Sequence, residues 1–307
     1  MTEVLRQALA GGDAVAAVVV TYQVDAEALE GLLRALHGEV AAVVVVDNAS
    51  LSWRELRSPL PLQVIRLPHN LGVAAAQNRG VEAALAQGAA QVLLLDQDSR
   101  PEPGLVAALR QALAAAQAAG RPAAAAGPAV VDEHGVVEGF VRFRSGRYEA
   151  IAPPADGAPL DCDMLIASGQ LIPRQGWHRV GPMAEGLFID KVDTEWCLRA
   201  TQAGLCLLGV PAARLHHRLG ERQLRLWFGR WRTLPQHRPF RYYYMWRNSL
   251  LLRRLPHAGA AWRRADTRQL RSLLLYFGLL APGRWAALRM MGRGLLDGWR
   301  GVQGPLK

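Results

Sequence analysis

An acidic triplet, Asp96-Gln97-Asp98, is the part of the sequence best suited to holding a metal ion. It follows four apolar residues, Val92–Leu95, so we expect it on a turn that leaves a buried strand. Two carboxylates one residue apart on a turn can point at a common site and supply the hard oxygen ligands that Mg²⁺ or Mn²⁺ prefers. A cation there would neutralise a diphosphate leaving group. Because a solvated turn explains such a triplet equally well, its position in the fold has to decide.

A second acidic turn, Asp47-Asn48, ends the apolar run Val40–Val46. An acid at a strand end accepts hydrogen bonds from a base or ribose in nucleotide-binding folds, but Asp and Asn also cap turns and helices. The first strand is followed by no Gly-x-Gly-x-x-Gly, and no Gly-Lys-Ser/Thr loop occurs. These absences disfavour a dinucleotide oxidoreductase and a P-loop ATPase.

Three carboxylates, Asp190, Asp193 and Glu195, gather where we expect a helix over residues 190–204. On that helix Asp190 and Asp193 would share a face, and Glu195 would point away. A carboxylate at the mouth of a crevice can act as general base on a hydroxyl. The alternative is that these acids complement the positive end of the helix dipole.

A histidine pair, His216-His217, offers a neutral imidazole that can complete the coordination of a metal or bind a phosphate. A solvated surface histidine is the alternative.

The elements that must position these residues alternate along the first 130 residues. We expect strands over 15–22, 40–46, 62–67 and 91–95, and helices over 26–36, 74–87 and 104–119. Such alternation predicts a Rossmann-like α/β fold, a mostly parallel sheet with helices on both faces. Thr21, Asp47 and Asp96 would then meet in one crevice at the carboxyl ends of the strands. We expect short antiparallel strands over 123–160, the small turn Ser168-Gly169 in a strand over 161–173, and helices after residue 220.

Charge divides the chain in two. Residues 1–213 carry 16 Lys/Arg and 23 Asp/Glu, a net of −7, whereas residues 214–307 carry 20 and 3, a net of +17. The second part therefore suits a polyanionic partner, either nucleic acid, an anionic membrane or a lipid diphosphate. The three cysteines form no Cys-x-x-Cys pair, so we expect them to be reduced. We find no signal peptide and no apolar run long enough to span a membrane, and expect a cytoplasmic protein.

Eight segments together resemble the family-2 inverting glycosyltransferases of GT-A fold, most of all bacterial dTDP-rhamnosyltransferases of O-antigen (lipopolysaccharide) and related polysaccharide biosynthesis. The likeness covers most of the chain. Its segments are residues 18–22 (VVVTY), 46–50 (VDNAS), 70–80 (NLGVAAAQNRG), 95–99 (LDQDS), 168–169 (SG), 188–199 (FIDKVDTEWCLR), 217–220 (HRLG) and 237–248 (HRPFRYYYMWRN).

The resemblance implies roles for the matching residues. Asp193 would be the catalytic base, with Glu195 in reserve, because many relatives have Glu where this chain has Val192. Asp98 would be the main metal ligand, His217 a metal or diphosphate contact, and Asp96 a ribose contact. The rest of the donor site would comprise Thr21, Tyr22, Asp47, Asn48, Asn70, Asn78, Gln97, Ser168 and Gly169.

The implied reaction is transfer of L-rhamnose, with inversion, from dTDP-L-rhamnose to a hydroxyl of a glycan or lipid-linked saccharide, assisted by Mg²⁺ or Mn²⁺. A hexose or galactofuranose donor is the nearest alternative. From another class, a basic nucleic-acid-binding protein would not need Asp98. A non-catalytic sugar-nucleotide-binding protein would not need Asp193. The acidic first two thirds argue against a nucleic-acid partner.

We expect a catalytic domain over 1–220 and a basic, Trp/Arg-rich helical region over 221–307. Tryptophan and arginine at helical spacing are typical of an amphipathic helix in a membrane interface, so we expect peripheral binding to the inner face of the cytoplasmic membrane. Ordinary packing of these helices on the catalytic domain is the alternative. The residues that indicate an interface are Trp227, Phe228, Trp231, Trp262, Trp285 and Trp299, with neighbouring arginines.

Overall fold

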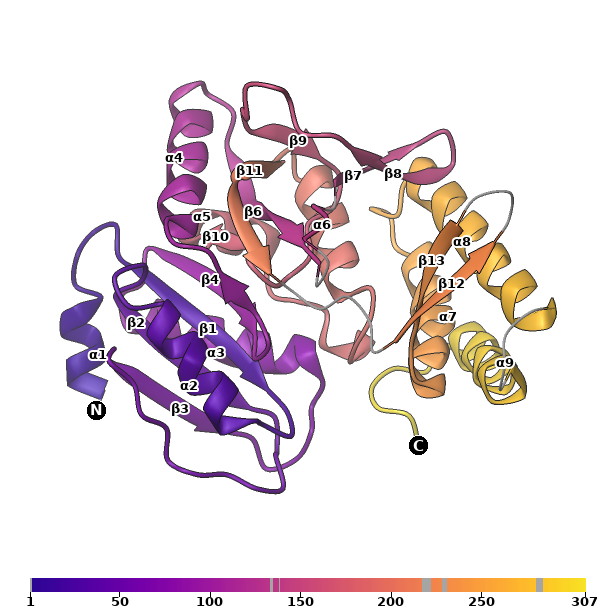
Figure 1. The fold of residues 1–307 in the computed structure, drawn as a ribbon, viewed down its shortest axis with the longest axis horizontal. Coiled ribbons are helices and arrows are strands. Elements are labelled where there is room, and N and C mark those ends of the chain that lie inside the picture. Colours follow the sequence, from indigo (N-terminus) through magenta and orange to yellow (C-terminus); the bar gives the residue numbers. More distant parts are fainter. Residues whose placement is uncertain (1, 133–134, 138, 217–221, 228–230, 280–283) are drawn as a thin grey trace.

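The first half of the chain forms the parallel part of a sheet (Figure 1). The computed structural model describes residues 2–132, 135–137, 139–216, 222–227, 231–279 and 284–307. Four neighbouring strands pair in parallel in the order β3-β2-β1-β4. Their bounds are β1 (Val15–Thr21), β2 (Ala42–Asp47), β3 (Leu62–Arg66) and β4 (Gln91–Asp96). These are the four strands predicted from the sequence.

Helices cover both faces of these strands, which explains their continuous runs of valine. Val18 and Val44 pack toward α3 (Val73–Ala86), in a cluster that also holds Leu5 of α1 (Thr2–Ala8). Val19 and Val45 point the other way, toward α2 (Ala26–Ala35) and α4 (Leu105–Ala118). Each helix that was predicted here is present, whereas α1 was not predicted.

The second half of the sheet is mixed rather than parallel. β10 (Leu171–Pro173) runs antiparallel to both β4 and β6 (Ala123–Val131). β6 pairs in parallel with β11 (Cys206–His216), and β11 pairs antiparallel with β5 (Arg100–Pro101) and β9 (Leu160–Cys162). The prediction of antiparallel pairing for residues 123–160 therefore holds for one neighbour of β6, β10, and is wrong for the other, β11. It also holds for the hairpin of β7 (Phe140–Arg144) and β8 (Arg147–Ile151).

The segment after residue 220 begins as a hairpin, not as a helix. β12 (Arg222–Trp227) pairs antiparallel with β13 (Trp231–Gln236), in a sheet of its own. The helical prediction for Trp227 and Trp231 is wrong, and Phe228 lies outside the described residues. The helices predicted more broadly for this region follow the hairpin.

The C-terminal helices are α7 (Pro239–Arg253), α8 (Ala260–Leu279) and α9 (Arg284–Arg300), which lie at the far end of the molecule from β3 (Figure 1). α9 crosses α7 closely, since a Cβ at Gly294 would lie 2.3 Å from the carbonyl oxygen of Tyr243. α6 (Val192–Gln202) lies between the sheet and these helices (Figure 1), whereas α5 (Arg174–Val180) packs against β6 and β10 and precedes the short 3₁₀ helix Glu185–Leu187. No helix among the described residues is long and apolar enough to cross a membrane.

The three cysteines are all free thiols, as expected from their spacing. Cys162 and Cys197 are buried, and burial raises the pKa of Cys162 to about 12. Thiols in such surroundings are inert at neutral pH and contribute packing rather than reactivity.

Candidate active site

The carboxyl ends of β1, β2 and β4 bring three predicted residues together. In the strand register Thr21 lies opposite Asp47, and Val20 lies opposite Asp96. The hydroxyl of Thr21 lies 3.4 Å from a carboxylate oxygen of Asp47. The predicted meeting of these strand ends at one edge of the sheet is therefore what the structure shows.

Asp47 organises the turn that follows β2. Its buried carboxylate accepts hydrogen bonds from the backbone N–H of Ser50 at 3.2 Å and from the Ser50 hydroxyl. Arg66 Nε lies 3.4 Å from its other oxygen. Asp47 thus caps a turn, which was one of its two interpretations from the sequence, and its contact with a nucleotide stays a prediction.

Asn48 and Asn70 join the same turn to the start of α3. The Asn48 side chain donates to Asn70 Oδ1 at 3.0 Å and accepts from the backbone N–H of Leu71 at 2.8 Å. Asn70 Oδ1 also accepts from the N–H of Gly72 at 2.9 Å. These bonds hold the loop before α3 against the end of β2, so both asparagines lie at the same edge of the sheet as Asp47.

The acidic triplet is fixed to β1 through Gln97. The Gln97 side chain accepts from the backbone N–H of Tyr22 at 3.0 Å, and its amide nitrogen lies 3.3 Å from the Tyr22 carbonyl oxygen. The two carboxylates that flank it differ in exposure, because Asp96 is half-buried and Asp98 is exposed. Tyr22 itself is about half exposed, so its ring is accessible beside the triplet.

The turn Ser168-Gly169 lies directly behind Asp96. Ser168 Oγ accepts from the backbone N–H of Asp96 at 3.3 Å and lies 2.6 Å from the hydroxyl of Ser99. Gly169 has φ of +85°, and a Cβ on it would lie 2.6 Å from Pro128. The two predicted residues therefore support the triplet, and only glycine fits the second position without strain.

His216 ends β11 next to the triplet. It lies opposite Arg100 in the β11–β5 pairing, and its Nε2 is 2.8 Å from a carboxylate oxygen of Glu102. The predicted metal contact, His217, lies outside the described residues. Asp96 and Asp98 stand on the turn that leaves β4, and β11 brings the chain back beside that turn. The described residues alone include no group of three His, Cys, Asp or Glu side chains that could hold a metal ion, so the metal site stays a prediction.

Asp193 occupies the first turn of α6, with raised basicity. Its carboxylate accepts a hydrogen bond from the backbone N–H of Thr194 at 2.7 Å. Burial raises the pKa of Asp193 above its usual value, and the negative charge of Asp190 adds to the rise, while Thr194 and Lys191 oppose it. A carboxylate with a raised pKa is a better general base than an ordinary aspartate.

The chain reaches α6 through an unusual backbone. Phe188, Asp190 and Lys191 all have positive φ, of 66°, 62° and 63°. Residues other than glycine rarely adopt this conformation, and it concentrates at functional sites where the surrounding contacts hold it. The predicted start of the helix at 190 is therefore wrong, and Asp190 and Asp193 do not share a helical face.

The other two carboxylates of this cluster have partners. Asp190 forms a two-pronged ion pair with Arg241 of α7. Glu195 is buried and accepts from Arg199 Nε and Nη2 at 2.6 and 2.8 Å, with His257 Nε2 at 3.0 Å. Only Asp193 combines partial exposure with a raised pKa.

Asn78 lies within α3 and binds the segment before α6. Its side chain donates to the carbonyl oxygen of Met183 and to Glu185, both at 3.0 Å, and accepts from the N–H of Met183 at 2.8 Å. These bonds use its donors and its acceptor within the protein. Its predicted part in donor binding stays a prediction.

Several residues of the site were not predicted. Ser50 and Ser99 lie in the segments that carry the resemblance, which was the available signal. Lys191, whose side chain is 8% exposed, donates to Asp266 at 2.7 Å. Burial works to lower the pKa of Lys191, but Tyr148 and Asp266 outweigh it and raise the pKa above its usual value. No spacing in the sequence pairs residues 191 and 266.

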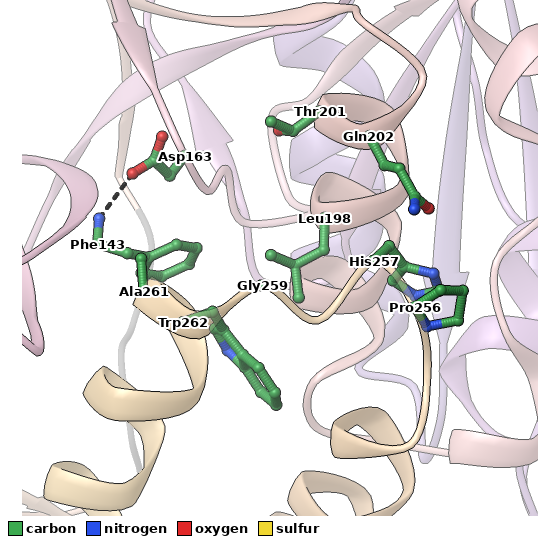
Figure 2. A pocket seen from close by; sticks show the side chains of 10 residues that line it. All are labelled: Phe143, Asp163, Leu198, Thr201, Gln202, Pro256, His257, Gly259, Ala261 and Trp262. Carbon is green, nitrogen blue, oxygen red and sulfur yellow. Dashed lines mark hydrogen bonds between the residues drawn. The ribbon is translucent and has the colours of Figure 1, made fainter.

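A cavity of about 290 Å³ lies at the other end of α6 (Figure 2). Leu198, Thr201 and Gln202 of α6 line it together with Phe143 and Trp262. Thr201 is eight residues from Asp193, about 12 Å along the helix axis. The cavity therefore lies at the opposite end of α6 from Asp193.

Sequence comparisons relate the chain to known glycosyltransferases. Residues 16–130 match the family described as Glycosyl transferase family 2. The chain is 29% identical to "dTDP-rhamnosyl transferase RfbF" of Shigella flexneri over 296 residues, 94% of this chain and 96% of that protein.

Two solved structures share the fold at low identity. TarS 1-349 of S. aureus in complex with UDP-GlcNAc has a TM-score of 0.55 and 13% identity, over 93% of this chain and 81% of that one. GalNAc-T7 with UDP, GalNAc and Mn²⁺ has a TM-score of 0.53 and 16% identity, over 67% of this chain and 43% of that one. The chain thus carries a glycosyl transferase family 2 domain, and it is a glycosyltransferase of GT-A-like fold.

Proposed function

We propose that the protein transfers L-rhamnose from dTDP-L-rhamnose to a hydroxyl group of a glycan or lipid-linked saccharide. The observation that carries this proposal is the likeness to the Shigella flexneri dTDP-rhamnosyl transferase over nearly the whole of both chains. The strand ends support it, since Thr21, Asp47, Tyr22 and Gln97 lie together at one edge of the sheet. In open α/β sheets this edge is where nucleotides bind.

The proposal includes a divalent cation, Mg²⁺ or Mn²⁺, held chiefly by Asp98 with Asp96 in support and His217 as a further ligand. The bound cation would stabilise the negative charge of the departing diphosphate as a Lewis acid. Carboxylate oxygens and one imidazole are suitable ligands for either ion. The solved structure of GalNAc-T7 contains Mn²⁺, which is in line with such a site on this fold.

In this mechanism Asp193 removes the proton from the acceptor hydroxyl as that oxygen attacks the anomeric carbon of the donor. Attack from the face opposite the leaving diphosphate inverts the anomeric configuration. The raised pKa of Asp193 supports this role, because it brings the basicity of the carboxylate closer to neutral pH. The internal ion pair of Glu195 argues against the reserve assignment.

We further propose that the protein binds to the surface of an anionic membrane through the outer face of α9. α9 packs its small buried face, which includes Gly294 and Gly298, toward α7. Its outer face leaves Trp285 and Trp299 74% and 72% exposed, with Leu296 at 45%. Exposed arginines accompany them on that face, namely Arg289, Arg293 and Arg300.

Tryptophan and leucine beside arginine suit the boundary between lipid headgroups and acyl chains. The packing alternative accounts for Trp262, which is 1% exposed and belongs to the main core. It does not account for Trp285 and Trp299. A lipid-linked acceptor of O-antigen assembly at the inner face of the cytoplasmic membrane would lie within reach of a protein docked in this way.

A thermal-stability screen tests the choice of donor. With Mg²⁺ or Mn²⁺ present, we expect dTDP-L-rhamnose to raise the melting temperature more than UDP-hexoses or UDP-galactofuranose do. A larger rise in melting temperature with a UDP-sugar would show that the donor is a UDP-sugar rather than dTDP-L-rhamnose. The protein would still be a glycosyltransferase. If no sugar nucleotide stabilises the protein and an oligonucleotide does, the nucleic-acid alternative gains and the donor site is lost.

A further inference from the structure

The segment that precedes Asp193 is held largely through its backbone carbonyl groups. The carbonyl groups of residues 186–190 all receive hydrogen bonds from other parts of the chain. That of Phe188 accepts from the N–H of Val73, at the start of α3. The remaining four accept from two adjacent residues of α7, Arg247 and Asn248.

Asn248 spans the strained part of this segment. Its side-chain nitrogen lies 3.0 Å from the carbonyl oxygen of Leu187 and 2.8 Å from those of Ile189 and Asp190. The side chain is fully buried, so water cannot replace it. Two of the three residues of this segment that have positive φ, Phe188 and Asp190, stand within the stretch that it holds. A single amide therefore stabilises the conformation that leads into α6.

Arg247 orients Asn248 and holds the start of the same segment. Its Nε donates to Asn248 Oδ1 at 2.9 Å, and its Nη2 donates to the carbonyl oxygens of Leu187 and Gly186 at 2.8 and 3.3 Å. Within the described part of the chain no carboxylate pairs with this buried guanidinium. The rings of Tyr243 and Tyr244, with centroids at 5.4 and 4.8 Å, lie against it instead.

The C-terminal tail closes this arrangement. Arg247 Nη1 donates to the carbonyl oxygen of Gly304, whose own N–H donates to the carbonyl oxygen of Gly186 at 2.8 Å. The bonds of Arg247 all depend on the planar fork of its guanidinium, which a lysine ammonium cannot reproduce. The side chains of the segment are also anchored on the C-terminal helices, Asp190 by Arg241 and Lys191 by Asp266.

We propose that Arg247 and Asn248 are the positioning residues for the catalytic base, setting the conformation of residues 186–191 and thereby the place of Asp193. This inference rests on the proposed role of Asp193 in glycosyl transfer. It assigns the C-terminal helices a part in the chemical step that is separate from any contact with a membrane. A displacement of the base by about 1 Å can reduce turnover a hundredfold while the donor still binds.

The chain offers a matched control for the loss of such contacts. Arg174, at the start of α5, also binds carbonyl oxygens, those of Leu85 and Ala89 at 2.7 Å. It joins α5 to the turn before β4, at the opposite end of that strand from Asp96. Its substitution should lower stability without moving Asp193.

The test compares Asn248→Ala, Asn248→Gln, Arg247→Lys and Arg174→Ala with wild type. We expect Asn248→Ala and Arg247→Lys to lower kcat about a hundredfold, with KM for dTDP-L-rhamnose changed less than about threefold. Asn248→Gln, which keeps the amide, should recover about tenfold of the loss. Arg174→Ala should keep kcat within about twofold at a comparable loss of melting temperature.

Amide hydrogen exchange of residues 186–193 supplies a readout that does not need turnover. Exchange there should accelerate in Asn248→Ala and not in Arg174→Ala. Unchanged exchange, or kcat within twofold of wild type in Asn248→Ala, would overturn the inference, as would equal losses of kcat in the Asn248 and Arg174 variants. If wild type neither binds nor turns over the donor, the proposed function fails, and exchange still decides whether Asn248 orders the segment.

Discussion

Glu195 and Arg199 form a two-pronged ion pair one turn apart in α6, with N–O distances of 2.6 and 2.8 Å. Asp193, on the same helix, has no such partner among the described basic residues, and burial raises its pKa. The pairing therefore separates two acids that the sequence could not rank. It makes Glu195 a structural residue and leaves Asp193 as the candidate base.

The first prediction follows from this separation. Asp193→Asn should lower kcat about 10²- to 10⁴-fold, the usual contribution of a general base, and leave donor affinity unchanged. Glu195→Gln should mainly lower the melting temperature, because it removes the negative charge that pairs with the guanidinium of Arg199. Release of dTDP during transfer measures both. Equal turnover by Asp193→Asn and wild type would remove Asp193 as the base.

The second prediction concerns stability and pH. The pKa of Asp193 is raised in the folded protein, so the folded state binds a proton more readily than the unfolded state does, and its ionised form destabilises the fold. The contribution of this group to stability is thus present at low pH and lost as pH rises through the folded pKa. Asp193→Asn should melt higher than wild type at about pH 7, and the difference should shrink on acidification. A lower melting temperature for the variant at every pH would contradict this account.

The third prediction uses two glycines with the same backbone conformation. Gly169 and Gly104 have φ of +85° and +83°, but only a Cβ on Gly169 meets other atoms. Gly104→Ala should cost about 1 kcal/mol from backbone strain alone. Gly169→Ala should cost about 3 kcal/mol, because Pro128 and Leu215 must also move. Urea denaturation measures the difference, and equal costs would show that the turn behind Asp96 is loosely packed.

The fourth prediction tests the outer face of α9. The double variant Trp285→Ser/Trp299→Ser should reduce binding to vesicles containing phosphatidylglycerol at least about tenfold, and added salt should weaken wild-type binding. Val4→Ser, which alters another exposed apolar residue on α1, is the control and should bind like wild type. Vesicle flotation gives the measurement.

Two outcomes would reject the membrane proposal. Equal binding by the double variant and wild type would show that α9 is not the docking face. A concentration-dependent dimer in size-exclusion chromatography that the double variant abolishes would assign these tryptophans to a second copy of the chain instead.

The sheet edge that carries the proposed donor site was predictable because its strands are short, continuous runs of apolar residues, many of them β-branched, that end in polar turns. Val15–Thr21 and Ala42–Asp47 bury both faces, so their residue type leaves little choice of structure. β6 was harder to place, because its alanines have little preference for a strand. It becomes one only through pairing with β10 and β11.

The sequence of the hairpin after residue 220 contains both the apolar spacing of a helix and the alternation of a strand. Trp227 and Trp231 are four apart, which favours a helix, but Leu224 and Leu226 alternate with polar residues, which favours a strand. The structure follows the second pattern. The contacts of Asn248 with residues 187–190 had no local signal at all, because they join segments about 60 residues apart.

The most direct test of the account is calorimetric titration of dTDP-L-rhamnose with Mn²⁺ into wild type and Asp98→Ala, with Asp13→Asn as a control for the loss of an exposed carboxylate. We predict metal-dependent binding by wild type and by the control, and binding at least about a hundredfold weaker by Asp98→Ala. Equal affinity of wild type and Asp98→Ala, or binding that is unchanged when the metal is removed by chelation, would contradict the metal site at the acidic triplet.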